Sequence, residues 1–137
     1  MKYQSRYFTC GPATLYNVFQ FYGKDIPEDE CCEFSVNGTS MRQLIAGIEK
    51  HGFNYEVLKT RDSFKAYQWL DTSIRLGSPV ILCVDNWEHW MACIGKCGDK
   101  WVVADTGDLE LVIYPTIEEL MERWKHDNRY YAIAVTK

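Results

Sequence analysis

The sequence lacks the features that mark membrane, exported or nucleic-acid-binding proteins. No apolar run approaches the roughly 20 residues of a bilayer-spanning helix, and the first residues are polar and aromatic, so no signal peptide is indicated. Lys and Arg do not cluster and the formal net charge is −4, which argues against a nucleic-acid surface. No linker, internal repeat or low-complexity tract divides the chain. We therefore expect one soluble domain over residues 1–137 in a reducing, cytoplasmic setting.

The cysteines do not form a recognisable disulfide or metal framework. There is no C-x-x-C pair, and the adjacent Cys31-Cys32 is poorly suited to disulfides, so we interpret most cysteines as free thiols. A zinc site built from His89, Cys93 and Cys97 is the alternative, but their spacing along an expected strand would not bring the three ligands together. The sequence therefore predicts no metal and no cofactor.

Helical spacing of apolar residues dominates the N-terminal half. Gly23 is a natural stop for the first helix, and Ser40 with Gln43 has the form of a capping box that opens another. Ser63 is the expected cap of a further helix. The predicted helices cover residues 12–22, a short segment from residue 27, residues 41–51 and residues 63–76. A half-buried strand is predicted over residues 53–57, with Phe53, Tyr55 and Val57 facing inward.

Strand signals take over after Pro79. Short apolar runs separated by tight turns predict an antiparallel meander, and Thr116 with Glu119 forms a second capping box. The predicted strands cover residues 80–84, 89–95, 100–104, 109–114 and 130–135. The fold class is therefore α+β, with a helical N-terminal half packed on a mainly antiparallel C-terminal β-sheet. The first helix is expected to face the sheet along a cleft.

Cys10 is the first residue whose position suggests chemistry. It stands just before the expected helix start, with Gly11 leaving the backbone open beside the sulfur and Pro12 suiting a first helical turn. Unsatisfied N–H groups and the positive end of the helix dipole favour a thiolate there. The alternative is a buried thiol that acts as a small hydrophobe.

His89 and Asp105 are the best partners for such a thiol. His51 and His126 are explained by helix ends, whereas His89 begins an apolar strand at the edge of the cleft. If the strands 89–95 and 100–104 form a hairpin, Asp105 lies beside His89. Asp105 would then accept a hydrogen bond from Nδ1 of His89, while Nε2 would face Cys10.

An acyl-transfer site also needs donors for an oxyanion. The backbone N–H of Cys10 is one, and Gln4 supplies a side-chain amide if the chain folds back beside the helix start. Tyr7, Trp87 and Trp90 flank this proposed site and are candidates for substrate contact, although core packing explains them equally well.

These residues together resemble the peptidase C39 family, the papain-like cysteine peptidases best known as leader-cleaving domains of bacteriocin-exporting ABC transporters. The resemblance extends over almost the whole chain. Its segments are Gln4, Cys10-Gly11-Pro12-Ala13, Gly38-Thr39-Ser40, Gly77-Ser78-Pro79-Val80, His89-Trp90 and Val103-Ala104-Asp105. It implies the papain-like cysteine peptidase fold, with Cys10 as nucleophile, His89 as base and acid, Asp105 as its orienting partner and Gln4 as oxyanion donor.

Two departures from the family pattern matter. Many members have an acid just before the nucleophile, where this chain has Thr9. Transporter members continue into membrane helices and a nucleotide-binding domain, so we expect a stand-alone member. The resemblance predicts a cysteine peptidase that cleaves a peptide or protein substrate, after small residues of a leader peptide. The alternatives are an acyl-transfer or isopeptidase variant that uses the same triad, and a non-catalytic peptide-binding or protein-binding module.

Overall fold

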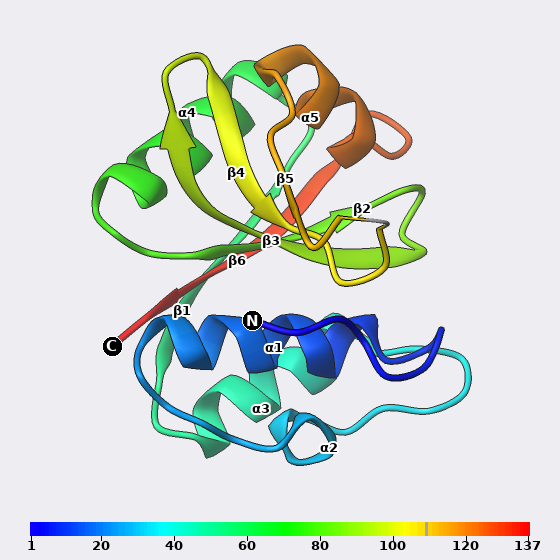
Figure 1. Cartoon of the computed structure of the whole chain (residues 1–137). Helices are drawn as coiled ribbons and strands as arrows, with labels where there is room; N and C mark the ends of the chain where they lie inside the picture. Colours follow the sequence, from blue (N-terminus) through cyan, green and yellow to red (C-terminus); the bar gives the residue numbers. More distant parts are fainter. Residues whose placement is uncertain (109) are drawn as a thin grey trace.

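The computed structural model describes residues 1–108 and 110–137 (Figure 1). Helices and strands follow one another along the chain in the order that the sequence predicts. The helices are α1 (Cys10–Phe21), α2 (Glu28–Cys31), α3 (Met41–Lys50), α4 (Ser63–Arg75) and α5 (Ile117–Trp124). The strands are β1 (Asn54–Thr60), β2 (Val80–Val84), β3 (His89–Cys97), β4 (Lys100–Ala104), β5 (Val112–Ile113) and β6 (Tyr130–Thr136). The α+β class is therefore confirmed.

The six strands form a single antiparallel sheet in the order β1-β6-β2-β3-β4-β5. The run from β2 to β5 is the predicted meander. The insertion of β6 between β1 and β2 was not predicted, and it joins the last strand to both halves of the chain. The strand predicted over residues 109–114 is shorter in the structure: β5 has two residues, and Leu109 lies outside the described residues.

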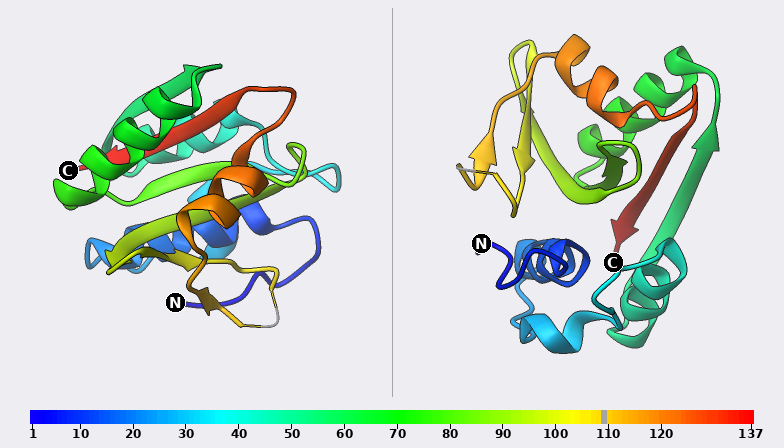
Figure 2. Two further views of the ribbon diagram at one scale, coloured as in Figure 1. Left: turned by 90° about the horizontal axis from the view of Figure 1, so that it is seen from above. Right: turned by 90° about the vertical axis from the view of Figure 1, so that its right-hand side faces the viewer.

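Helices cover both faces of the sheet, as the views in Figure 2 show. On one face, α1 and α3 pack against the sheet through a buried cluster that includes Leu15, Phe19 and Ile81. On the other face, α4 and α5 contribute Leu70 and Leu120 to a second buried cluster. Neighbouring residues of β2 point into opposite clusters, which explains why every residue of β2 is buried.

The capping boxes at Ser40 and Thr116 are confirmed at the starts of α3 and α5. The predicted cap of α4 is wrong by one residue. Asp62, not Ser63, accepts hydrogen bonds from the N–H groups of Phe64 and Lys65. A carboxylate satisfies the free N–H groups and also complements the positive end of the helix dipole, so Asp62 takes the cap.

The predicted phase of the first strand also needs correction. Tyr55 is exposed, whereas Leu58 is buried against α4 in the second cluster. In the described sheet, β1 is an edge strand that pairs with β6. The face that carries Leu58 is covered by α4, whereas Tyr55 is exposed. Within the described ranges, no helix combines the length and apolarity needed to cross a bilayer.

Candidate active site

Cys10 is the first residue of α1 and is only 6% exposed. The N-cap residue, Thr9, makes no side-chain cap because its hydroxyl group exchanges hydrogen bonds with the backbone of Arg6. The first N–H groups of α1 therefore have no side-chain cap from Thr9, and they lie at the same end of the helix as the Cys10 sulfur. Gly11 lets this end pack closely, since a Cβ there would lie 2.5 Å from Thr39.

Two interlayer hydrogen bonds hold α1 and the neighbouring loop against β3. The Thr14 hydroxyl donates to the carbonyl of Trp90 at 3.2 Å, and the Trp90 indole N–H donates to the carbonyl of Thr39 at 2.8 Å. Both contacts lie next to His89, the first residue of β3. The start of α1 and the start of β3 are thus fixed side by side.

His89 contacts both Asp105 and Cys10. Its Nε2 lies 2.6 Å from Oδ1 of Asp105, and its ring also forms a hydrogen bond with the Cys10 side chain. The β3–β4 hairpin accounts for this proximity, because Ala92 pairs with Ala104 and Asp105 follows directly. The ring orientation expected from the sequence is wrong: Asp105 takes Nε2, which leaves Nδ1 for Cys10. The close packing of α1 on β3 explains the difference, since Nδ1 is the ring nitrogen nearer the backbone.

These contacts set the charge state of His89. Burial by itself would lower the pKa of the His89 ring, but the hydrogen bonds to Asp105 and Cys10, with their charges, outweigh burial and raise it to about 9. The imidazole is therefore held in its protonated form near neutral pH. The positive charge of this ring lies beside the Cys10 side chain, with which the ring shares a hydrogen bond.

Asp105 is 2% exposed, yet its carboxylate is fully partnered. Oδ1 accepts from His89 and from the N–H of Gly107, and Oδ2 accepts from Arg123 at 3.2 Å. Burial acts to raise the pKa of Asp105, but these donors and the two positive charges hold it below its usual value. Asp105 thus stays ionised beside the protonated ring.

Gln4 lies beside the pair, but its amide is already engaged. The N–H of Gln4 donates to the carbonyl of Thr106, and its side-chain Nε2 donates to the carbonyls of Arg6 at 2.8 Å and Tyr7 at 3.0 Å. A Cβ at Gly107 would touch both Gln4 Oε1 and the His89 ring, so the two side chains are neighbours. A ligand that takes a hydrogen bond from this amide has to replace one of these carbonyls.

The N-terminal segment that carries Gln4 is held by a buried carboxylate on α2. Glu28 accepts hydrogen bonds from the N–H and hydroxyl of Ser5 and pairs with Lys2 at 3.2 Å. Burial acts to raise the pKa of Glu28, but these partners lower it overall. The segment before α1 is therefore ordered rather than frayed.

The three aromatic residues expected near the site have different surroundings. Tyr7 is 84% exposed and lies three residues before Cys10. Trp87 is partly exposed and stacks on Tyr131 at 5.1 Å between ring centres. Trp90 is buried in the first cluster, and its indole N–H donates to the carbonyl of Thr39.

The remaining cysteines are free thiols with other surroundings. Burial raises the pKa of Cys31, Cys32, Cys83 and Cys93 to about 12 in each case. The proposed zinc ligands do not converge: His89 contacts Asp105, Cys93 is buried and Cys97 is exposed. Within residues 1–108 and 110–137, no three His, Cys, Asp or Glu side chains are placed to share a metal ion.

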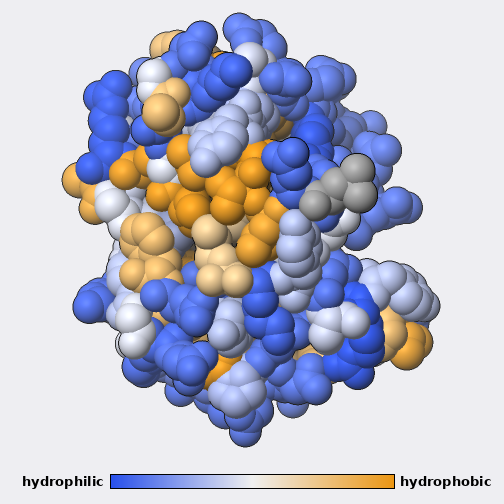
Figure 3. Space-filling model, viewed as in Figure 1, coloured by the Kyte–Doolittle hydropathy of each residue, from blue (hydrophilic) through white to orange (hydrophobic). Residues whose placement is uncertain are grey.

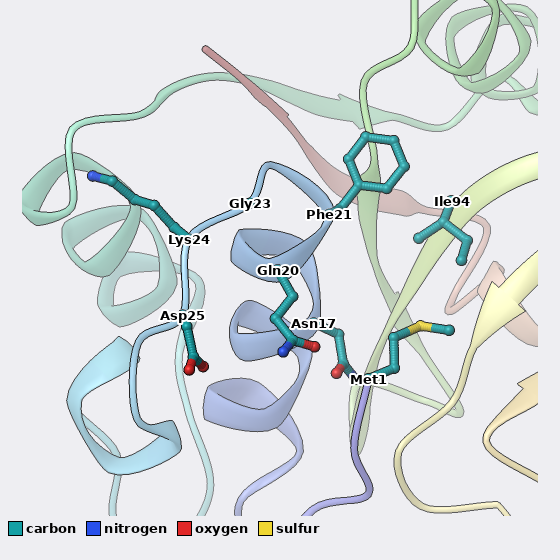
Figure 4. Close-up of a pocket in the computed structure, with 8 residues that line it drawn as sticks. All are labelled: Met1, Asn17, Gln20, Phe21, Gly23, Lys24, Asp25 and Ile94. Atoms are coloured by element: carbon teal, nitrogen blue, oxygen red, sulfur yellow. The ribbon is translucent and has the colours of Figure 1, made fainter.

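One hollow borders His89 and another borders the C-terminal end of α1. A cavity of about 380 Å³ borders His89 on the Asp105 side and is lined by Asp85, His89, Asp105, Gly107, Asp108 and Arg123. A pocket of about 400 Å³ lies at the C-terminal end of α1, where Phe21, Ile94 and Met1 surround the space in Figure 4. Apolar side chains are exposed between the helical layer and the sheet in the view of Figure 3. Of these two hollows, the first is the one lined by His89 and Asp105.

Sequence reasoning missed Arg123, Asp85 and Gly107. Arg123 stands in the last turn of a helix, where a cation is expected from the helix dipole alone, and Asp85 lies in a turn. The three residues share no sequence signal that would have linked them to His89.

The chain resembles known peptidases both in sequence and in fold. The model of the peptidase C39 family matches residues 1–135. A search of curated proteins finds no significant match. Among solved structures, the peptidase domain of Streptococcus ComA, a bifunctional ABC transporter, has a TM-score of 0.77 at 20% identity, covering 98% of this chain and 96% of that one.

Two further solved structures share this fold. A double glycine motif protease from an AMS/PCAT transporter, in complex with its leader peptide, has a TM-score of 0.75 at 16% identity, covering 98% of this chain and 88% of that one. The peptidase domain of Streptococcus mutans ComA with a small-molecule inhibitor has a TM-score of 0.69 at 15% identity, covering 100% and 98%. The chain thus has the papain-like α+β fold of these peptidase domains.

Proposed function

The chain belongs to the peptidase C39 family, and from this premise we propose that it is a cysteine peptidase that uses Cys10, His89 and Asp105. The observation that carries the proposal is the position of His89, which contacts Cys10 at the start of α1 and Asp105 behind it. Nucleophile, base and orienting group are then in the order that acyl transfer requires.

The proposed reaction begins with the Cys10 thiolate and the His89 imidazolium. The sulfur attacks the carbonyl carbon of the scissile peptide bond, and the backbone N–H of Cys10 stabilises the resulting oxyanion. His89 gives its proton to the leaving amide nitrogen, the C–N bond breaks, and an acyl-enzyme remains on Cys10. Water then attacks the thioester while His89 accepts its proton, which releases the acid and restores the thiolate.

Gln4 is the proposed second oxyanion donor, with a condition set by its contacts. Its amide nitrogen donates to the carbonyls of Arg6 and Tyr7, so one of these hydrogen bonds must give way to the substrate oxygen. Tyr7 is 84% exposed and precedes Cys10 by three residues. Exchange at the Tyr7 carbonyl would therefore couple substrate binding to this segment.

The substrate class follows from the buried position of Cys10. With 6% exposure and Thr39 packed against Gly11 beside it, the approach to the sulfur is narrow. We propose cleavage after small residues of a peptide or protein segment, as suggested by the double glycine motif protease that shares this fold. Trp87 and Tyr7 are proposed to border the substrate, whereas Trp90 supports the site from the core.

The direct test uses peptides containing Gly-Gly, Gly-Ala and Leu-Leu sequences, analysed by mass spectrometry after incubation with the protein. We expect cleavage after the small pairs, none after Leu-Leu, and none by the Cys10→Ala variant. Cys83→Ala is the matched control, because it removes another buried thiol from the same cluster. Cleavage retained by Cys10→Ala refutes the proposal, and product masses lacking the added water identify acyl transfer instead of hydrolysis.

A second test requires no substrate. Iodoacetamide should alkylate Cys10 at pH 7 faster than Cys31, Cys32 and Cys93, because burial raises the pKa of those three thiols to about 12. Peptide mapping after a short exposure measures all the rates together. Equal rates would favour a non-catalytic binding module on the same fold.

A further inference from the structure

Arg123, in the last turn of α5, pairs with two carboxylates, those of Asp85 and Asp105. Its Nε and Nη2 form a two-point pair with Asp85, at 3.0 and 2.7 Å, and Nη2 also donates to Oδ2 of Asp105 at 3.2 Å. Burial opposes the charge of Arg123, but Asp85 and Asp105 together raise its pKa further above its ordinary value. A guanidinium suits this geometry because its donors form a rigid planar fork.

The Asp85 end of this contact lies in the turn that leads into His89. Asp85, Asn86 and Trp87 all have positive φ angles, of 54°, 58° and 68°. Non-glycine residues seldom adopt this conformation, and three in succession persist only where the surroundings hold them. Arg123 holds Asp85 twice, since the Asp85 N–H also donates to the Arg123 carbonyl at 3.0 Å.

The Asp105 end of the contact completes a buried carboxylate. Oδ1 of Asp105 already accepts from His89 and from Gly107, and Arg123 donates to the other oxygen, Oδ2. Removing a partner from a buried carboxylate leaves it free to rotate or to draw in water. Rotation of Asp105 would release the Nε2 proton of His89.

We propose that Arg123 is a positioning residue that locks Asp105 and the turn before His89 into one unit, thereby fixing the His89 ring toward Cys10. The proposal rests on the proposed function of this site. It assigns no contact with substrate to Arg123. A lysine at this position would keep the charge but could not hold both carboxylates with the same planar fork.

This role of Arg123 as a tether, which holds Asp105 and the turn before His89 together, can be distinguished from an effect of its charge on the His89 ring. His89 contacts Cys10 from α1 and Asp105 after β4, and it lines a cavity together with Asp85, Asp108 and Arg123. Arg123 is the only permanent cation among the six residues that line this cavity. Loss of its charge acts to raise the pKa of His89, whereas release of Asp105 acts to lower it, because the hydrogen bond with Asp105 raises that pKa. Exchange of the Nε2 proton with water is therefore the measurement that reports the position of Asp105.

The experiment follows the His89 ring by NMR in protein labelled at histidine, which reports its pKa and the exchange of its Nε2 proton with water. Arg123→Gln should speed exchange of the His89 Nε2 proton about tenfold, because Asp105 is no longer held on that nitrogen. The double variant Arg123→Gln/Asp85→Asn removes one charge of each sign, so the net charge is that of the wild type while exchange should stay fast. Arg123→Lys keeps the charge and should still exchange faster. Lys125→Gln, which removes a cation paired with Glu122, is the matched control and should not change the exchange.

Slow proton exchange in both the double variant and Arg123→Lys would overturn the proposal. So would equal acceleration by the Lys125→Gln control. Because the NMR readout needs no substrate, it is independent of peptidase activity. If Cys10→Ala retained cleavage while the Arg123 variants still freed the His89 ring, the proposed function would fail and the tether would stand. Normal slow exchange with Cys10-dependent cleavage would reject the tether alone.

Discussion

Stability should fall as pH rises through the region where His89 loses its proton. The pKa of His89 is raised from 6.5 to about 9 in the folded protein, because Asp105 and Cys10 outweigh the effect of burial. The folded state therefore binds the proton more tightly than the unfolded chain. This contribution is complete below about pH 6.5, declines above it, and is lost as pH passes about 9.

The size of the effect follows from the pKa difference. Each pKa unit corresponds to about 1.4 kcal/mol, so the contribution at low pH is about 3 kcal/mol. Because the His89 side chain is only 16% exposed, solvent screening reduces this little. Between pH 6 and pH 8.5, about 2 kcal/mol of this contribution should be lost.

The measurement is the free energy of unfolding by urea, under reducing conditions, from pH 6 to pH 8.5. The upper limit matters because the buried thiols, with pKa values raised to about 12, add a separate loss of stability above about pH 9. His89→Gln should lose most of the pH dependence, while His126→Gln should keep it. A wild-type change below about 0.5 kcal/mol, or an unchanged slope in His89→Gln, would refute this account of His89.

Two glycine substitutions test the packing around the site. Gly11→Ala brings a Cβ to 2.5 Å from Thr39 and should destabilise the protein by about 1–3 kcal/mol in urea unfolding, with recovery in the Gly11→Ala/Thr39→Gly double variant; failure to recover would contradict a local clash. Gly107→Ala brings a Cβ to 3.2 Å from Cε1 of His89 and 3.1 Å from Oε1 of Gln4. It should lower peptide cleavage about tenfold with a smaller effect on unfolding, and an unchanged cleavage rate would count against the assigned positions of these side chains.

Local signals in the sequence were sufficient for several elements. The capping boxes depend on side chains three residues apart, so Ser40 and Thr116 could be assigned without knowledge of the rest of the fold. The β3–β4 hairpin is equally local, and it brings Asp105 to His89. These predictions succeeded because the interactions that decide them lie within a few residues of each other.

Long-range pairing was harder to anticipate. The place of β6 between β1 and β2 depends on matching residues far apart in the chain, such as Val57 with Ile133 and Ile81 with the same Ile133. The exposed Tyr55 has the same origin, because the cover given by α4 decides which face of β1 is buried. Alternation of apolar residues identifies a strand but not the helix that will pack on it.

The ring orientation of His89 shows why the details of a site require the packed layers. The prediction from the sequence paired Nδ1 with Asp105, whereas the structure pairs Nε2 with it. The choice depends on how closely α1 approaches β3, which the hydrogen bonds between Thr14 and Trp90 and between Trp90 and Thr39 determine. With Cys10 held next to the nearer nitrogen, Asp105 has to reach the outer one.

The pairing of Asp105 with Nε2 of His89 also explains how Arg123, which lies on a different element, can contact this site. A carboxylate that reaches the outer nitrogen from the end of β4 lies away from α1, in the space where α5 meets the turn before His89. It is buried there, so a second partner besides His89 stabilises it. Arg123 donates to its other oxygen, and the same guanidinium pairs with Asp85 in the turn of positive φ angles. The orientation of His89 and the proposed role of Arg123 therefore both follow from the close packing of α1 on β3.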